Sequence, residues 1–137
     1  MSERTGACRC GRVWYAAAGG IKAVVNCHCA MCRQMNGAAF STYAVVSENG
    51  LSVTRGGALL AAYTVVGTAT RHFCPRCGSP LFNTNPDRYP GLAMLYLGGI
   101  RGHEDLSPGA NIHCDSKLPW VDAVARIPGR PGGPRSG

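Results

Sequence analysis

Cys74-Pro75-Arg76-Cys77-Gly78 and Cys8-Arg9-Cys10 are the two stretches that decide the fold. The proline pre-sets φ for a tight turn, and the glycine can take the positive φ that curls the backbone around an ion. Side chains two residues apart on an extended chain point the same way, so the Cys-x-Cys pair can reach one ion. The four thiolates together predict a closed tetrahedral site, which is typical of structural zinc. Such an ion would tie the start of the chain to its middle.

A second cluster, Cys27-His28-Cys29-Ala30-Met31-Cys32, can bring three sulfurs to one ion and leaves it one ligand short. His28 lies between two ligands, and the alternation of an extended chain should point it away from the metal. Cys114, beside His113, could close the site, or the fourth position could stay open for water or a substrate thiol. A different pairing, in which Cys8, Cys10, Cys27 and Cys29 share one ion, also remains open at this stage.

Composition and charge exclude several classes of protein. The sequence has no run of about 18 apolar residues that could span a membrane, and residues 1–6 carry no apolar core of a signal peptide. We therefore expect a cytoplasmic protein. In that reducing compartment, the cysteines should bind metal rather than form disulfides. The formal charge is +7, but residues 126–137 contribute three arginines and no acid. Seven thiolates on two zinc ions would remove three further charges, which leaves no basic groove for specific nucleic-acid binding.

The pattern predicts one domain over residues 1–125, followed by a disordered basic Gly/Pro/Arg tail over 126–137. Short apolar runs between Gly, Pro and Asn breakers predict a mainly β, mostly antiparallel fold. We expect a hairpin turn at Asn49-Gly50 and a helical turn over Met31–Asn36 that ends at Gly37. The predicted strands are Arg12–Ala17, Ile21–Val25, Ala39–Val46, Leu51–Thr54, Leu59–Val66, Thr70–Phe73, Pro80–Asn83 and Leu92–Leu97.

The chain resembles the glutathione-dependent formaldehyde-activating enzymes, whose domain is shared with centromere protein V. The resemblance covers about residues 5–123, and the motifs that carry it occur in the family's order. They are Gly6–Gly11, Cys27–Arg33, Asn36–Phe40, Phe73–Phe82 and Ile112–Trp120.

The resemblance implies the β-tent fold, with antiparallel sheets stapled by zinc, and two zinc ions. Cys8, Cys10, Cys74 and Cys77 match the structural ligands, and Cys27, Cys29 and Cys32 match the catalytic ones. It also implies carbon–sulfur lyase chemistry on adducts of glutathione, or a related small thiol, with formaldehyde or another small aldehyde. The alternative function is a non-catalytic zinc module that binds protein or nucleic acid.

Three residues are candidates for substrate binding. Asn111 stands where relatives commonly have a histidine, a departure that bears on substrate choice if this segment borders the catalytic zinc. Arg33 directly follows a metal ligand, and Lys117 lies in the last motif, so either could bind a carboxylate of a tripeptide. Tyr43, Tyr96 and Trp120 are predicted core residues. No general acid or base and no oligomeric state can be assigned from the sequence.

Overall fold

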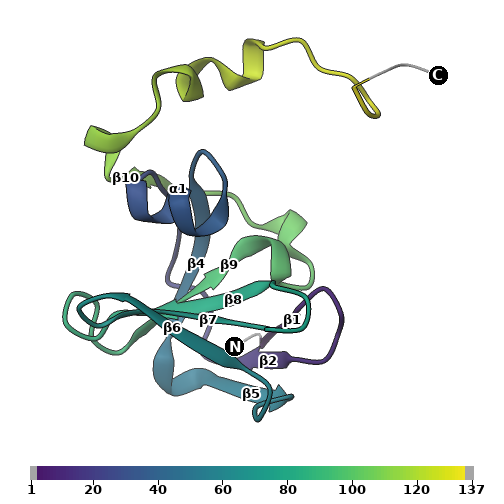
Figure 1. Ribbon diagram of the computed structural model, residues 1–137, viewed down its shortest axis with the longest axis vertical. Helices are drawn as coiled ribbons and strands as arrows, with labels where there is room; N and C mark the ends of the chain where they lie inside the picture. Colours follow the sequence, from purple (N-terminus) through teal and green to yellow (C-terminus); the bar gives the residue numbers. More distant parts are fainter. Residues whose placement is uncertain (1–2, 135–137) are drawn as a thin grey trace.

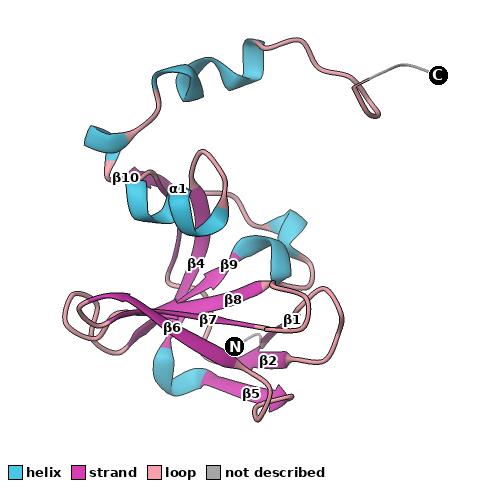
Figure 2. Ribbon diagram, viewed as in Figure 1, coloured by secondary structure: helices cyan, strands magenta, loops and turns pink. Residues whose placement is uncertain are grey.

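The computed structural model describes residues 3–134, which form two β-sheets, one short α-helix and several 3-10 helices (Figures 1 and 2). The smaller sheet has the strand order β1-β2-β5, and the larger has the order β10-β3-β4-β9-β8-β7-β6. All neighbours are antiparallel except the parallel pair β10 and β3. The strands are β1 Arg4–Ala7, β2 Trp14–Ala17, β3 Ala23–Cys27, β4 Ser41–Ser47, β5 Leu51–Arg55, β6 Ala61–Val66, β7 Ala69–Phe73, β8 Pro80–Thr84, β9 Leu92–Tyr96 and β10 Ala110–Ile112.

The mainly β, mostly antiparallel prediction is confirmed, and each of the eight predicted strands overlaps an observed one. Sequence reasoning missed β1 and β10. Both strands are short, and neither has enough apolar residues to show an alternation of period two. These segments become strands because they pair with β2 and β3, and their own sequences carry no strand pattern.

The predicted hairpin at Asn49-Gly50 is wrong. Glu48–Gly50 is a single 3-10 turn, and β5 leaves the sheet of β4 to pair with β2. Gly50 serves a close approach of two backbones instead, because a Cβ at this position would lie 2.2 Å from the carbonyl oxygen of Ala18. An Asn-Gly pair therefore marked a change of sheet rather than a tight hairpin.

The core lies against one face of the larger sheet. Ala44 and Val46 of β4 and Leu95 of β9 are fully buried there, together with Val13 and Tyr15. The opposite faces of the same strands carry Tyr43 and Tyr96, which form a second, smaller cluster. Because side chains alternate along a strand, β4 and β9 separate the core from whatever covers their other face.

Helix α1, Ala30–Asn36, confirms the predicted helical turn and ends at Gly37, which has φ 63°. Further 3-10 turns are Leu97–Gly99, His103–Asp105 and Cys114–Ser116, followed by the longer Pro119–Arg126. Within residues 3–134, no helix has both the length and the apolar character that a bilayer crossing requires.

The C-terminal segment, yellow-green in Figure 1, runs from β10 past α1 and away from the sheets. Trp120 lies in this segment with 49% of its surface exposed, so its prediction as a core residue is wrong. Residues 127–134 form bends without a helix or strand. The domain boundary at residue 125 stays a prediction, and residues 1–2 and 135–137 lie outside the described range.

Gly6 lies on β1 opposite Tyr15, where a Cβ would meet the tyrosine ring at 2.3 Å and the carbonyl oxygen of Gly99 at 2.7 Å. We expect Gly6→Ala to lower the free energy of unfolding by about 1–3 kcal/mol, because a methyl group overfills a packed site. Urea denaturation of the zinc-loaded protein measures the change. Gly57→Ala is the matched control, since its nearest neighbour would be 3.8 Å away, and an equal loss in both variants would contradict the packing argument.

Candidate functional site

The first group of thiols joins Cys8, Cys10, Cys74 and Cys77, whose sulfurs all lie within 4.8 Å of one another. The Sγ atoms of Cys8 and Cys10 are 3.6 Å apart, and those of Cys10 and Cys74 are 3.8 Å apart. A zinc ion with Zn–S bonds of about 2.3 Å holds its sulfurs about 3.8 Å apart, whereas a disulfide needs about 2.05 Å. The geometry therefore fits four zinc ligands and no disulfide, and all eight cysteines are free.

Backbone and hydroxyl donors surround these sulfurs. The amide of Val13 donates to Cys8 Sγ at 3.3 Å. The Ser79 hydroxyl accepts a hydrogen bond from the amide of Arg9 and lies 3.3 Å from Cys77 Sγ, where its own proton can be donated. Its hydrogen bond is the largest of several causes that lower the pKa of Cys77, to about 5.

The second group of thiols, Cys27, Cys29 and Cys32, lies where β3 ends and α1 begins, and its sulfurs also lie within 4.8 Å of one another. Cys29 is the N-cap of α1, and its sulfur accepts from the amide of Cys32 at 3.2 Å. A Cys-x-x-Cys pair at a helix N-terminus places both sulfurs on the same side of the first turn. Cys27 ends the strand with its sulfur 3.5 Å from that of Cys32, again a spacing that suits zinc.

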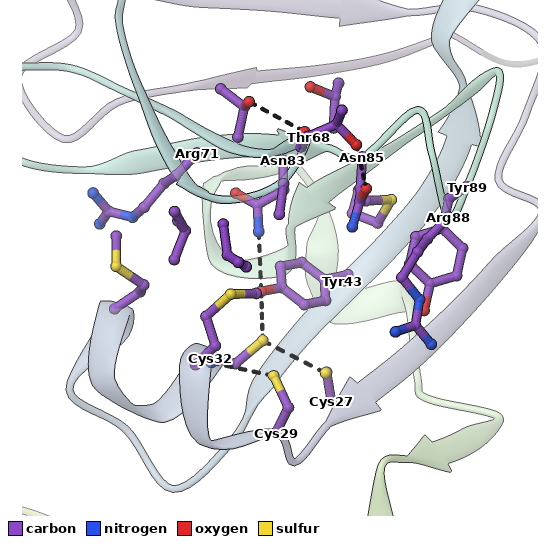
Figure 3. Close-up of a pocket in the computed structure, with 18 of the residues that line it drawn as sticks. Cys27, Cys29, Cys32, Tyr43, Thr68, Arg71, Asn83, Asn85, Arg88 and Tyr89 are labelled. Atoms are coloured by element: carbon purple, nitrogen blue, oxygen red, sulfur yellow. Dashed lines mark hydrogen bonds between the residues drawn. The ribbon is translucent and has the colours of Figure 1, made fainter.

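Among the described residues, this group gains no fourth ligand. Cys114 is exposed, and its thiol donates to the carbonyl oxygen of Asn111 at 3.5 Å. The buried His28 turns away, as the alternation predicted, and its Nε2 lies 3.0 Å from Asn111 Oδ1. That oxygen also accepts from the side chain of Asn26, so His28 Nε2 is the donor. The three sulfurs remain a three-ligand set that faces a cavity (Figure 3).

A chain of hydrogen bonds orients the Tyr43 hydroxyl toward the second group of thiols. The Tyr96 hydroxyl donates to Asn83 Oδ1 at 3.0 Å, which orients the amide so that its Nδ2 donates to the Tyr43 hydroxyl at 3.2 Å. The Tyr43 hydroxyl lies 3.2 Å from Cys32 Sγ and donates its proton to this sulfur, because the thiol of Cys32 itself donates to Cys27 Sγ. Burial raises the pKa of Tyr43 well above its usual range, so this donor stays protonated.

The cavity has a volume of about 710 Å³ and lies over the second face of the larger sheet, opposite the core. Its floor comes from alternate residues of neighbouring strands, namely Val25, Val45, Met94 and Leu92, and Met31 and Met35 of α1 contribute to one side. Arg71, Asp87 and Arg88 are the charged residues of the lining. Figure 3 shows Arg71 and Arg88 on opposite sides of the view, with the three cysteines below and between them.

The three predicted substrate-binding residues lie outside the lining of this cavity. Arg33 Nη1 donates to the carbonyl oxygens of His28 and Ser116, at 2.7 and 2.6 Å, and so joins the start of α1 to the C-terminal segment. Lys117 forms an ion pair of 2.9 Å with Asp122, and Asn111 binds His28. Their roles in substrate binding stay predictions, although the contacts seen here are structural.

Sequence reasoning missed the polar residues that do line the cavity. Arg71 comes from β7, Asn83 from β8 and Arg88 from the turn after β8, all far along the chain from the second group of thiols. Arg71 stacks over the ring of Phe73 at 5.2 Å, and its Nε is buried without a hydrogen-bond partner. No local motif marks these residues, and only the pairing of β7 with β8 and of β8 with β9 brings them to the cavity.

The comparisons with known proteins agree with this architecture. The family model described as "Glutathione-dependent formaldehyde-activating enzyme" matches residues 3–116. A crystal structure of a Rhodobacter sphaeroides protein is similar, with 25% sequence identity and a TM-score of 0.62, over 78% of this chain and 98% of that one. No curated protein matches the chain.

The two groups of thiols predict two bound zinc ions with different consequences for stability. Cys77→Ser is expected to lose one equivalent of zinc and to leave the chain poorly folded, because structural zinc contributes about 10 kcal/mol or more of apparent binding free energy. Cys114→Ser is the matched control and should keep two equivalents and full stability, since Cys114 lies outside both groups. Metal analysis and thermal unfolding measure both. A Cys114→Ser protein with a single zinc would instead make Cys114 a ligand.

Proposed function

The chain belongs to the glutathione-dependent formaldehyde-activating enzyme family, and from this membership and the geometry of the cavity we propose that it is a zinc-dependent carbon–sulfur lyase. It acts on adducts of glutathione, or a related small thiol, with formaldehyde or another small aldehyde. The observation that carries the proposal is the set of three converging thiols, without a fourth protein ligand among the described residues, at the wall of a large cavity. We assign the activity to the cytoplasm, where reducing conditions keep thiols free.

Cys27, Cys29 and Cys32 would hold the catalytic zinc, while Cys8, Cys10, Cys74 and Cys77 would hold the structural one. When bound by three thiolates, zinc supplies an open position that lowers the pKa of a substrate thiol and polarises a carbonyl group. The residues of the chain do the rest of the work. Tyr43 donates a proton toward Cys32 Sγ and so stabilises negative charge on a ligand, and Asn83 and Tyr96 hold Tyr43 in that orientation.

The proposed reaction is a balanced addition and its reverse. The substrate sulfur forms a bond to the aldehyde carbon, the carbonyl π pair moves to oxygen, and the proton lost by the thiol ends on that oxygen. The cavity supports this step by bringing both reactants together at one place, which replaces a bimolecular encounter.

The charged residues of the lining suit a thiol with two carboxylates and one ammonium group, which is the charge pattern of glutathione. Arg71 and Arg88 offer two guanidinium groups, and Asp87 offers one carboxylate. The buried Nε of Arg71 has no partner within the described chain, so a ligand carboxylate would satisfy it. We therefore propose Arg71 and Arg88, beside the earlier candidates Arg33, Asn111 and Lys117, as residues that bind the thiol.

Zinc-loaded protein is expected to accelerate thiol–aldehyde exchange above the spontaneous rate, and a chelator that strips the second site should abolish the excess. The measurement is exchange NMR on glutathione with formaldehyde and with larger aldehydes. Tyr43→Phe should lower the rate about tenfold while leaving zinc content unchanged, since it removes one hydrogen bond to a ligand sulfur. Exchange at the background rate with every thiol and aldehyde tried would refute the proposed activity.

Arg71→Ala should raise the KM for glutathione about tenfold, because a hydrogen bond between charged groups is worth about 1.5–3 kcal/mol. Arg88 is exposed, so Arg88→Ala should have a smaller effect. Arg55→Ala provides the control, since Arg55 is an exposed arginine of β5 outside the cavity. Steady-state kinetics with varied thiol measure all three, and equal KM values for Arg71→Ala and Arg55→Ala would remove Arg71 from the site.

A further inference from the structure

The cavity is large for a reaction of a one-carbon aldehyde. Its volume of about 710 Å³ lies within the range of about 300–1,000 Å³ that holds drug-sized ligands. The hydroxymethyl group that formaldehyde adds to a sulfur has two heavy atoms and needs about 60 Å³, at about 30 Å³ for each group the size of water. The thiol can fill part of the remaining volume, so the chemistry of the lining decides what else binds.

That lining contains a continuous apolar strip, which we define as Val25, Val45, Leu92 and Met94. Val45 pairs with Met94 across β4 and β9, Leu92 lies two residues before Met94, and Val25 lies on β3 beside β4. Register therefore fixes these side chains on one face of the sheet. Each of them is partly exposed to the cavity rather than sealed in the core.

Glutathione does not suit this strip. Its peptide groups and carboxylates would lose water against apolar side chains without gaining hydrogen bonds, which is unfavourable. The charged residues Arg71, Asp87 and Arg88 give those groups a place elsewhere in the same cavity. With the thiol assigned to the charged residues and its sulfur directed to the cysteines, the other half of the adduct is left to occupy the apolar strip.

We propose that the apolar strip binds the substituent of the aldehyde, so that the preferred substrates are adducts of aldehydes with an alkyl or aryl group of several carbons rather than of formaldehyde. The inference rests on the proposed function, because it specifies the substrate of the same site. Met31 and Met35 line the cavity on α1 and can adapt to substituents of different shape, since methionine side chains are flexible and polarisable.

Stable S-alkyl thioethers test the inference by binding alone. They carry an alkyl chain on the sulfur where the aldehyde carbon would be attached. Isothermal titration calorimetry of the zinc-loaded protein would compare methyl, propyl and hexyl members of two series, S-alkylglutathiones and S-alkylcysteines. Affinity should rise about fourfold for each of the first few methylene groups, in at least one series, as expected for burial of a CH₂ group. Affinity that does not change with chain length in both series overturns the inference.

A matched pair of variants locates the effect. Val45→Phe fills the apolar strip and should remove most of the gain from methyl to hexyl, whereas Val124→Phe makes the same change at a side chain that is 51% exposed on the C-terminal segment. Val25→Phe on the neighbouring strand repeats the test if the first variant folds poorly. Equal gains in all folded variants would place the alkyl chain elsewhere and contradict the inference.

Kinetics separate this inference from the proposed function. The rate enhancement over the spontaneous reaction should be larger for hexanal than for formaldehyde with the same thiol. Exchange that favours formaldehyde, or that is insensitive to the aldehyde, overturns the inference and leaves the proposed function intact. Affinity that rises with chain length, without exchange of any aldehyde, contradicts the proposed function and leaves the apolar strip as a binding site.

Discussion

The alternation of side chains along β4 and β9 is the constraint on which both the core and the candidate site depend. Ala44, Val46 and Leu95 face the core, and the residues between them face the cavity. A change of register by one residue would exchange the two sets and place Tyr43 in the core. The sulfur of Cys32 would then lose its hydrogen-bond donor, so one strand register fixes the packing of the domain and the chemistry at the second group of thiols together.

Short-range patterns made part of this structure predictable. The spacing of the cysteines indicated both groups of thiols, and the position of His28 between two of them indicated that it turns away. Such signals work because the residues involved are neighbours in the chain. Tyr43, Asn83 and Tyr96 reach one another only through β4, β9 and β8, and Arg71 only through β7, so no local pattern could reveal them. Gly50 illustrates the same limit, because what requires a glycine there is the close approach of the Ala18 backbone, directly after β2.

The two groups of thiols share ligand chemistry and differ in surroundings. Around the first, the sulfurs meet an amide, a hydroxyl and one another, and the four thiols would complete a tetrahedron around a bound ion. Around the second, the sulfurs meet the N-terminus of α1, a buried tyrosine and a cavity with room for a ligand. A non-catalytic zinc module would need a closed second site, and Cys114, the sequence's best candidate to close it, points to a backbone carbonyl instead.

Family membership bears on the thiol substrate, whereas the side chains that line the cavity bear on the aldehyde. The family indicates a thiol that reacts with an aldehyde, and in the proposed function the three-cysteine group would hold the zinc that binds this thiol. Neither determines the size of the aldehyde, because the apolar strip proposed to bind its substituent comes from Val25, Val45 and β9 rather than from the metal-binding motifs. Strands can change their cavity-facing side chains without disturbing the core on their other face. Under the proposed function, a fold of this kind could therefore keep its carbon–sulfur chemistry while changes in the apolar strip alter the choice of aldehyde.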